Sequence, residues 1–562
     1  MMTALSETIS TDVLIIGGGT AGPMAAVKAK IQRPDVDVLL VDKATVRRGG
    51  SICRGMDAYN NVVVPGIATV EQYVESVRMM SDGIFDANLV RKTAEYSFSI
   101  LKELENWGVA KFPKDKDGQY IVSQFHPTGK FLAEMRGDIK PKMEQLVREQ
   151  GVKILNRTMA TRILTTDGRA TGAILFNIRT GKLTVCKAKA VIVCAGGQGR
   201  FALPDTGYLF GTFDCPYNAG EGFSMIYHAG GELANMEFMG ISPMIKDYEG
   251  PGHSTFTRHG AYLVNVMGER FMPKYSEFAE HAPGGIRATA MRTEIAEGRG
   301  PIYYDLRHLS LDTIEIIKEG IFAAERPTEK EFFSKKGVDI GRDLIELTMS
   351  GPNLCGGHAP SGVVINEHGE TTVAGLYAAG DVACTGWGFV GGAWVFGTLA
   401  GQHAAETVDD IATFPIDTNQ VSEERKRLFA PLNSAGKVEP DELEYKIRRV
   451  IKPYLKSPKA GPRLNIALDY VRQFRDDLGK VRARDYHQIM KVTEISAIID
   501  SLEMAARASL ARTESRWGDA HFRVDYPEKD LDWGQHFVVI EKDQSSGAMT
   551  TSKKPVPISK LK

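Results

Sequence analysis

The feature that constrains this chain most is an apolar run that ends in glycines, DVLIIGGGTAGPMAAVKAK, over residues 12–30. Gly17, Gly19 and Gly22 form the pattern G-x-G-x-x-G, which is typical of a buried strand that turns sharply into a helix, here expected over Pro23–Lys30. Such a turn presents backbone N–H groups and the positive end of the helix dipole to a pyrophosphate. The alternative is a tight strand–helix turn that binds no ligand. The neighbouring segments distinguish between these two interpretations.

A second strand supports the nucleotide interpretation. The segment VDVLLVDK ends at Asp42 and Lys43, about 20 residues after Gly22, where a carboxylate in this kind of fold binds the ribose hydroxyls. A third apolar strand, AKAVIVCAGGQG over residues 188–199, ends in Ala195, Gly196 and Gly197. The spacing therefore predicts a parallel α/β sheet whose strand ends hold a dinucleotide.

A distant turn distinguishes FAD from a nicotinamide dinucleotide. The segment TTVAGLYAAGDVACTG, residues 371–386, predicts a strand that enters Gly380-Asp381, and a glycine-started helix with Gly391 and Gly392 follows. FAD has a ribityl chain that needs this additional anchor, and backbone N–H groups near Gly391 and Gly392 can stabilise a reduced, anionic flavin. A simple type I turn at Gly380-Asp381 is the alternative. We predict an FAD site.

Composition narrows the class of protein. A chain of 562 residues exceeds what one core usually supports, so we expect two or three domains. The 69 basic and 70 acidic residues give no electrostatic basis for binding nucleic acid. No apolar run reaches the ~18 residues of a membrane span, and the first residues lack the pattern of a signal peptide. Six scattered cysteines without a C-x-x-C pair predict neither a metal site nor disulfides, which favours a cytoplasmic location.

Segment patterns predict the domain order. Residues 1–236 and 351–414 are expected to form a Rossmann-like FAD-binding domain of the glutathione-reductase type, split by an α+β capping domain at 237–350. Within the cap, HGAYLVNVMGERFMPKY is typical of a β-hairpin with its turn at Met267-Gly268. Apolar residues at helical spacing predict a C-terminal helical domain at 415–542. The polar residues 543–562 are expected to be disordered.

With these segments in place, the chain resembles the flavoprotein subunits of the succinate dehydrogenase/fumarate reductase superfamily over nearly its whole length. The resemblance lies in NAGEGFSMIYHAGGELANMEF, GERFM, EIAEGRGPIYYD and ESRWGDAHFRVDYPEKDLDW. Within the superfamily the chain is most similar to the alpha subunit of dissimilatory adenylylsulfate reductase. The similarity there lies in RRGGSICRGMDAYNN, GGHAPSG, GWGF and the RVDYPEKD ending.

The resemblance implies a site. The glycine- and arginine-rich loop at 46–61 is expected to pack on the flavin ring, and it contains no histidine, so FAD should be bound noncovalently. The residues expected to hold FAD are Gly17, Gly19, Gly22, Asp42, Lys43, Arg48, Gly49, Gly50, Ser51, Gly55, Ala195, Gly196, Gly197, Glu221, Gly380, Asp381, Gly391 and Gly392. The candidate catalytic side chains are His358, Asn60, Arg287, Arg292 and Trp387.

The sequence also departs from the family patterns. The dicarboxylate enzymes carry a proton-donating arginine where this chain has Thr289, and a substrate-binding arginine where it has Phe389. The adenylylsulfate reductases carry an arginine in a segment where this chain has Met244 and Ile245. The first two departures lead us to expect neither fumarate nor succinate as substrate, and the absence of the arginine at Met244 and Ile245 argues against adenylylsulfate.

The predicted function is that of an FAD-dependent oxidoreductase subunit. It exchanges electrons between a small substrate and a small iron–sulfur, ferredoxin-like partner, because the chain's own cysteines are not spaced for a cluster. Two alternatives stay open. One is a stand-alone enoyl-type reductase or oxidase, and the other is a non-catalytic flavin subunit that only relays electrons.

Overall fold

A computed structural model describes residues 7–54, 58–203, 215–248, 250, 253–322, 327–410 and 415–557. Its central layer is a seven-stranded sheet in the order β6-β2-β1-β9-β8-β7, with β16 also on β9. β6, β2, β1, β9 and β16 pair in parallel, whereas β8 and β7 pair antiparallel. The strands are β1 (Glu7–Ile16), β2 (Val38–Val41), β6 (Lys153–Leu155), β7 (Thr158–Thr166), β8 (Arg169–Asn177), β9 (Leu183–Val193) and β16 (Leu376–Ala378). The predicted strands before Gly17, Asp42, Ala195 and Gly380 are confirmed.

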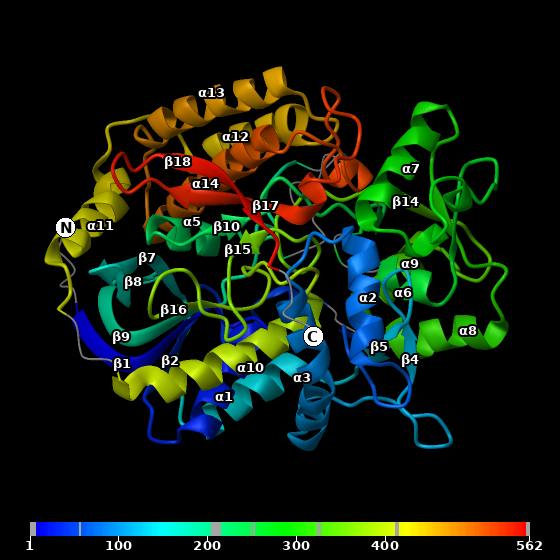
Figure 1. Cartoon of the computed structure of the whole chain (residues 1–562), viewed down its shortest axis with the longest axis horizontal. Coiled ribbons are helices and arrows are strands. Elements are labelled where there is room, and N and C mark those ends of the chain that lie inside the picture. The colour runs from blue at the N-terminus through cyan, green and yellow to red at the C-terminus, as the bar shows by residue number, and fades with distance from the viewer. Residues whose placement is uncertain are drawn as a thin grey trace.

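Helices cover this sheet. The helix after the glycine turn begins at Ala21, two residues earlier than predicted, and it packs against the later glycine-started helix (Figure 1). A Cβ at Gly397 or Gly401 would lie 2.6 or 2.3 Å from backbone oxygens of that first helix, so glycine permits the close approach. The helices of this part are α1 (Ala21–Gln32), α2 (Val70–Ser81), α3 (Ala87–Asn106), α4 (Ile139–Glu149), α5 (Glu221–His228) and α10 (Phe389–Thr407).

The expected cap region contains its own sheet, in the order β11-β14-β13-β12, and its own apolar core (Figure 1). Its strands and helices are β11 (Pro243–Ile245), β12 (Tyr262–Val264), β13 (Tyr303–Asp305), β14 (Ile345–Met349), α6 (His253–Arg258), α7 (Gly284–Ala296), α8 (Leu311–Glu315) and α9 (Pro327–Lys336). The predicted hairpin is corrected in part. The chain turns at Asn265–Gly268, but the returning segment makes only the bridge Val264–Arg270. β12 pairs instead with β13, and all three of its residues take part in this pairing.

The C-terminal part contains the predicted helices α12 (Pro440–Leu455), α13 (Gly461–Leu478) and α14 (Tyr486–Ala511), preceded by α11 (Thr418–Phe429). The prediction of a disordered tail is wrong for residues 543–557. β17 (His536–Lys542) pairs with β18 (Met549–Pro555) over seven residues. β18 is an edge strand, whose side chains mostly face solvent while its backbone pairs, so a polar, lysine-containing sequence suits it. Residues 558–562 lie outside the described residues.

Two smaller sheets complete the fold. β17 and β18 continue a sheet with β10 (Leu233–Ala234) and β15 (Gly362–Val363), so the chain's end joins segments from both halves of the expected FAD domain. A second sheet joins β3 (Ala58–Asn60), β5 (Lys130–Glu134) and β4 (Val122–Gln124). No helix in the described ranges is long and apolar enough to cross a membrane. The fold is the expected α/β architecture with a cap.

Candidate functional site

The first cavity lies where the parallel strands end. β1, β2, β9 and β16 run in the same direction, so the residues that follow them meet at one edge of the sheet. A cavity of about 370 Å³ opens there. Thirteen of the residues expected to bind FAD line it: Gly17, Gly19, Asp42, Lys43, Arg48, Gly49, Gly50, Ser51, Ala195, Gly196, Glu221, Gly380 and Asp381.

The three fingerprint glycines have different roles. Gly17 has φ +111°, and a Cβ there would lie 2.2 Å from the carbonyl oxygen of Cys194. A Cβ at Gly22 would lie 1.9 Å from the carbonyl oxygen of Gly17. At Gly19, by contrast, the nearest atom among the described residues is the Cα of Gly50 at 3.6 Å. Gly17 and Gly22 therefore allow close packing, whereas Gly19 leaves room beside the turn, which fits a pyrophosphate.

Charged side chains around this cavity are fixed by the protein itself. The Asp42 carboxylate accepts hydrogen bonds from the N–H groups of Gly18 and Ala44, both at 2.7 Å. Lys43 pairs with Glu221, and with Glu494 at 2.7 Å. Burial opposes the charge on Lys43, but the two carboxylates outweigh it and raise its pKa. Lys43 and Glu221 therefore shape the cavity mainly as an ion pair.

Lys140 is a residue that no sequence motif indicates. It is buried on α4, and its ammonium donates hydrogen bonds to the carbonyl oxygen of Gly18 and, at 2.7 Å, to that of Gly19. Burial lowers the pKa of Lys140 to about 8, although the nearby acids Asp42 and Glu144 favour its charge. Lys140 thus fixes the carbonyl groups of the glycine turn that is expected to bind the pyrophosphate. Local patterns miss it, because α4 follows the turn by more than 100 residues.

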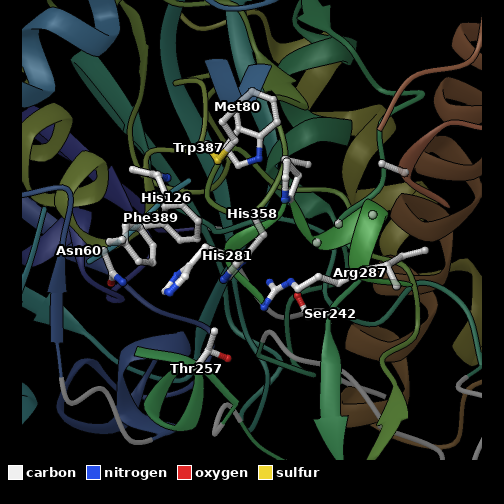
Figure 2. A pocket seen from close by; sticks show the side chains of 18 of the residues that line it. Asn60, Met80, His126, Ser242, Thr257, His281, Arg287, His358, Trp387 and Phe389 are labelled. Atoms are coloured by element: carbon white, nitrogen blue, oxygen red, sulfur yellow. The ribbon is translucent and has the colours of Figure 1, made fainter. Parts of the chain in front are cut away.

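A second cavity of about 230 Å³ continues from the first. Thr20, Ser51, Asp381 and Ala393 line both. Residues from the cap, from β3, from the loop after β4 and from the C-terminal segment line it. Figure 2 shows several of these side chains around the cavity. Of the candidate catalytic side chains, His358, Asn60, Arg287 and Trp387 line this cavity. The topology therefore brings together four side chains that are far apart in the sequence.

Arg292 does not line either cavity. Its guanidinium donates to the Asp519 carboxylate, with the shortest contact at 2.8 Å. Thr289 bonds the same carboxylate at 3.1 Å. Arg287 lies on the same helix, α7, five residues before Arg292, and it lines the second cavity. Burial lowers the pKa of its guanidinium. The sequence alone did not separate these two arginines.

His358 is held by its own loop. Its backbone N–H lies 3.1 Å from the Sγ of Cys355, and that sulfur lies 3.5 Å from the imidazole Nδ1. The ring of Phe389 meets the imidazole edge-to-face, with centroids 5.1 Å apart. These contacts restrict the orientation of a half-buried histidine beside the cavity.

His126 is a second residue that the sequence does not mark. Its Nε2 lies 2.8 Å from the Oδ1 of Asn61, whose amide nitrogen donates to the carbonyl oxygens of Trp387 and Gly388. Because Asn61 uses its N–H groups there, its Oδ1 accepts and the His126 Nε2 carries the hydrogen. Burial lowers the pKa of His126 to about 3, so the ring is uncharged at neutral pH. The sequence around Phe125 and His126 contains no recognisable motif.

Left-handed backbone also concentrates here. Of the non-glycine residues with positive φ, His126 (66°), Trp387 (59°), Phe389 (48°) and Trp517 (54°) all line the second cavity. Bulky residues rarely adopt this conformation, and such strain tends to occur at functional sites. The backbone geometry thus marks the same cavity as the side chains do.

The remaining predicted positions have other surroundings. Gly22, Gly197, Gly391 and Gly392 are not among the residues that line the two cavities. A Cβ at Gly391 would lie 2.2 Å from the carbonyl oxygen of Asn60, so this glycine allows α10 to approach β3. The N–H of Gly392 donates to the carbonyl oxygen of Gly388 at 2.6 Å. Gly55 lies outside the described residues.

Comparisons with known proteins agree with this geometry. The family model described as "FAD binding domain" matches residues 12–392, and "Fumarate reductase flavoprotein C-term" matches residues 445–562. An uncharacterized FAD-dependent oxidoreductase of Methanocaldococcus jannaschii is 27% identical, over 95% of this chain and 97% of its own. One of the fumarate reductase (CoM/CoB) subunits of Methanothermobacter marburgensis is 26% identical, over 96% of this chain and 98% of its own.

A solved structure shares the fold. Adenylylsulfate reductase from Archaeoglobus fulgidus superposes with a TM-score of 0.89 at 24% identity, covering 98% of this chain and 96% of that one. The family model spans more than half of the chain, and the cavity at the strand ends fits a dinucleotide. The chain therefore belongs to the FAD-binding-domain family and is an FAD-dependent oxidoreductase flavoprotein of the succinate dehydrogenase/fumarate reductase superfamily.

Proposed function

We propose that this flavoprotein holds FAD noncovalently in the first cavity and exchanges an electron pair with a small organic substrate in the second. The observation that carries the proposal is the continuity of the two cavities, which share Thr20, Ser51, Asp381 and Ala393. Bound FAD supplies the two-electron chemistry, and the protein supplies binding, orientation and proton transfer. A substrate-sized cavity that adjoins the cofactor cavity favours an enzyme over a protein that only relays electrons.

His358 is the side chain we propose for proton transfer or for binding an anionic oxygen. It lines the second cavity, and contacts with Cys355 and Phe389 restrict its orientation. A general acid or base needs this kind of fixed position beside the reacting atoms. Asn60, Trp387 and Arg287 line the same cavity and are proposed to position the substrate.

His126 has a different proposed role. With a pKa near 3 it stays neutral through the physiological range, so it does not exchange a proton with the substrate at neutral pH. Its bond to Asn61 connects it to the backbone of Trp387 and Gly388, where α10 begins. We propose that His126 fixes the strained start of this helix beside the cavity.

Fumarate and succinate are not the proposed substrates. Thr289 bonds Asp519 and does not line the cavity, and Phe389 adds an aromatic ring where the dicarboxylate enzymes carry an arginine. We expect fumarate turnover by the dye-coupled assay below the range of ~1–10³ s⁻¹ that is typical of enzymes on their own substrates. Turnover within that range would contradict this part of the proposal.

An iron–sulfur, ferredoxin-like protein is the proposed electron partner. The Methanothermobacter relative is named as a subunit, which supports an assembly, and the cysteines of this chain are dispersed. Their scattered positions do not suggest a disulfide framework, which supports the proposed cytoplasmic location. Co-purification of a brown iron–sulfur protein with the tagged chain tests the partner. A stand-alone yellow protein that turns over with oxygen would support the reductase or oxidase alternative instead.

The experiment that tests the core of the proposal begins with the purified protein. Acid precipitation should release FAD into the supernatant, because the loop at 46–61 offers no histidine for a covalent link. Flavin that stays with the pellet would contradict noncovalent binding. Substrate-dependent reduction of the flavin, followed anaerobically with an artificial dye, then separates an enzyme from a relay protein.

A further inference from the structure

We propose that the substrate of the second cavity is an organic acid whose carboxylate lies at one end and whose other end is a planar, apolar group. This inference rests on the proposed function, because it assigns the second cavity to the substrate. It follows from the way in which charge and aromatic surface are distributed over the cavity wall.

The cationic end belongs to the cap. Arg258 on α6 and Arg287 on α7 line the cavity together with the hydroxyl groups of Ser242 and Thr257. The carboxylate of Glu280 also lines it, but this carboxylate is held by Arg270 through contacts of 2.6 and 3.0 Å. Two arginines from two cap helices thus line the cavity, and a planar carboxylate matches the forked N–H geometry of a guanidinium.

Arg287 is the clearest indication of an anion site. Among the described residues it forms no ion pair, and its Nη1 donates a long hydrogen bond of 3.5 Å to the backbone oxygen of Glu280. Its Nε is buried without an acceptor in the described part of the chain. Arg287 is half-buried, and the Glu280 carboxylate that acts on its charge is already paired with Arg270. Desolvating such a guanidinium is costly, so a bound carboxylate would supply the counter-charge.

His281 and His126 do not add to this charge at neutral pH. Burial lowers the pKa of His281, and the neighbouring Arg287 lowers it further. Burial also lowers the pKa of His126, to about 3, so this ring is neutral as well. The positive charge at this end therefore comes from the arginines, which remain protonated across the physiological range.

The opposite end is apolar. Met80, Phe238, Trp387 and Trp517 form one buried cluster, and Phe389 packs against it. The Trp517 ring lies 4.4 Å from Phe238 and 5.1 Å from Trp387, centroid to centroid. Figure 2 shows Met80 and Trp387 at one end of the cavity and Arg287, Ser242 and Thr257 toward the other, with His358 between them.

This arrangement distinguishes between classes of acid. Apart from Asp381 on the cofactor side, the charged lining residues are Arg258, Glu280 and Arg287, all from the cap. A dicarboxylate with charges at both ends would place one carboxylate against the aromatic cluster, where desolvation is not compensated. An acid with an aromatic end instead buries apolar surface there and can stack on the rings.

The test is a titration of the purified FAD-containing protein with three probes, followed by calorimetry and by the flavin difference spectrum. The probes are 3-phenylpropanoate, 3-phenylpropanol and succinate. We expect 3-phenylpropanoate to bind at least about 10-fold more tightly than either of the others, since a charged hydrogen bond and an apolar contact are each worth that much. Succinate or the alcohol binding equally well or better would overturn the proposal.

Variants test which residues form the charged end and the apolar end of the second cavity. Arg287→Gln should weaken 3-phenylpropanoate roughly 10-fold or more and leave 3-phenylpropanol unchanged. The matched control is Arg307→Gln, an exposed cap arginine that pairs with Asp305 at 2.8 Å and should change neither. Phe389→Leu should weaken both phenyl probes and leave succinate unchanged. Equal loss of the acid and the alcohol in Arg287→Gln would overturn the assignment of the charged end.

Folding and cofactor content are measured on the same samples. Should Arg287→Gln not fold, Arg287→Lys keeps the charge without the forked geometry and should give a smaller loss of the acid probe. A colourless protein that still prefers 3-phenylpropanoate would contradict the proposed FAD chemistry alone. A yellow protein that prefers succinate would contradict the proposed substrate class alone.

Discussion

The first cavity is made mainly of main chain at the ends of four parallel strands, whereas the second is lined by side chains from several distant segments. In the first, glycines set the shape and fixed ion pairs such as Lys43–Glu221 supply the charge. In the second, strained aromatic residues and the half-buried Arg287 define the wall. A backbone-built site suits a cofactor shared by a whole family, and a side-chain-built site can differ from one member to the next.

We expect the strongest effect from a change in the first cavity. Gly19→Val should give a folded but colourless protein, because the branched side chain occupies the space beside the phosphate turn, where its Cβ would make only an ordinary contact of 3.6 Å with the Cα of Gly50. Gly22→Ala should instead destabilise the fold, since its Cβ would lie 1.9 Å from a carbonyl oxygen. FAD content and melting temperature separate the two. Stoichiometric FAD in a folded Gly19→Val protein would contradict the phosphate-turn assignment.

The next effect concerns catalysis in the second cavity. His358→Ala should slow substrate-dependent flavin reduction roughly 10²-fold or more, the usual contribution of a positioned acid or base. FAD content and melting temperature should stay nearly unchanged, because His358 lines only the second of the two cavities. His358→Gln should restore substrate binding more than rate. Loss of FAD with a normal reduction rate per bound flavin would make His358 a structural residue.

Lys140 offers a pH test of the first cavity. Lys140→Met should weaken FAD binding roughly 10-fold at pH 7, because the ammonium no longer holds the carbonyl oxygens of the phosphate turn. Lys142→Met is the control, since Lys142 lies on the same helix but bonds Gly108. Both are measured as FAD dissociation constants after reversible removal of the cofactor.

The sign of the pH effect follows from linkage. The pKa of Lys140 is lowered to about 8 by burial, with Asp42, Cys53 and Glu144 facing it. Bound pyrophosphate favours the protonated lysine, so FAD binding takes up a proton once the pH exceeds about 8, and affinity falls as the pH rises. The Lys140→Met protein should lack this fall. A fall that persists unchanged in the variant would assign the pH dependence to another group.

We expect the weakest effect from Arg292→Gln. Arg292 pairs with Asp519 outside the cavity, and its side chain is 44% exposed, so substrate affinity and flavin reduction should stay within about 3-fold of the parent protein. Arg287, on the same helix, is expected to matter much more. A loss in Arg292→Gln as large as that in Arg287→Gln would show that distance from the cavity does not separate the two residues.

Local sequence patterns predict the strand ends that frame the first cavity. Gly17, Asp42, Ala195 and Gly380 each follow an apolar strand, and parallel strands necessarily bring such residues to one edge. The same reasoning predicts the C-terminal helices, because apolar residues that recur at helical spacing indicate which face of a helix is buried. It fails for β18, whose side chains face solvent and carry no pattern of burial, while its backbone alone makes the pairing.

The second cavity, by contrast, depends on tertiary packing. Arg287 and Arg292 lie five residues apart on one helix, yet packing against Asp519 turns Arg292 away from the cavity that Arg287 lines. Lys140 and His126 act through contacts with Gly18 and Asn61, residues far away in the sequence, so no local pattern marks them. Strand ends and buried faces follow from neighbouring residues, but the meeting of side chains from separate segments depends on how the cap and the C-terminal part pack.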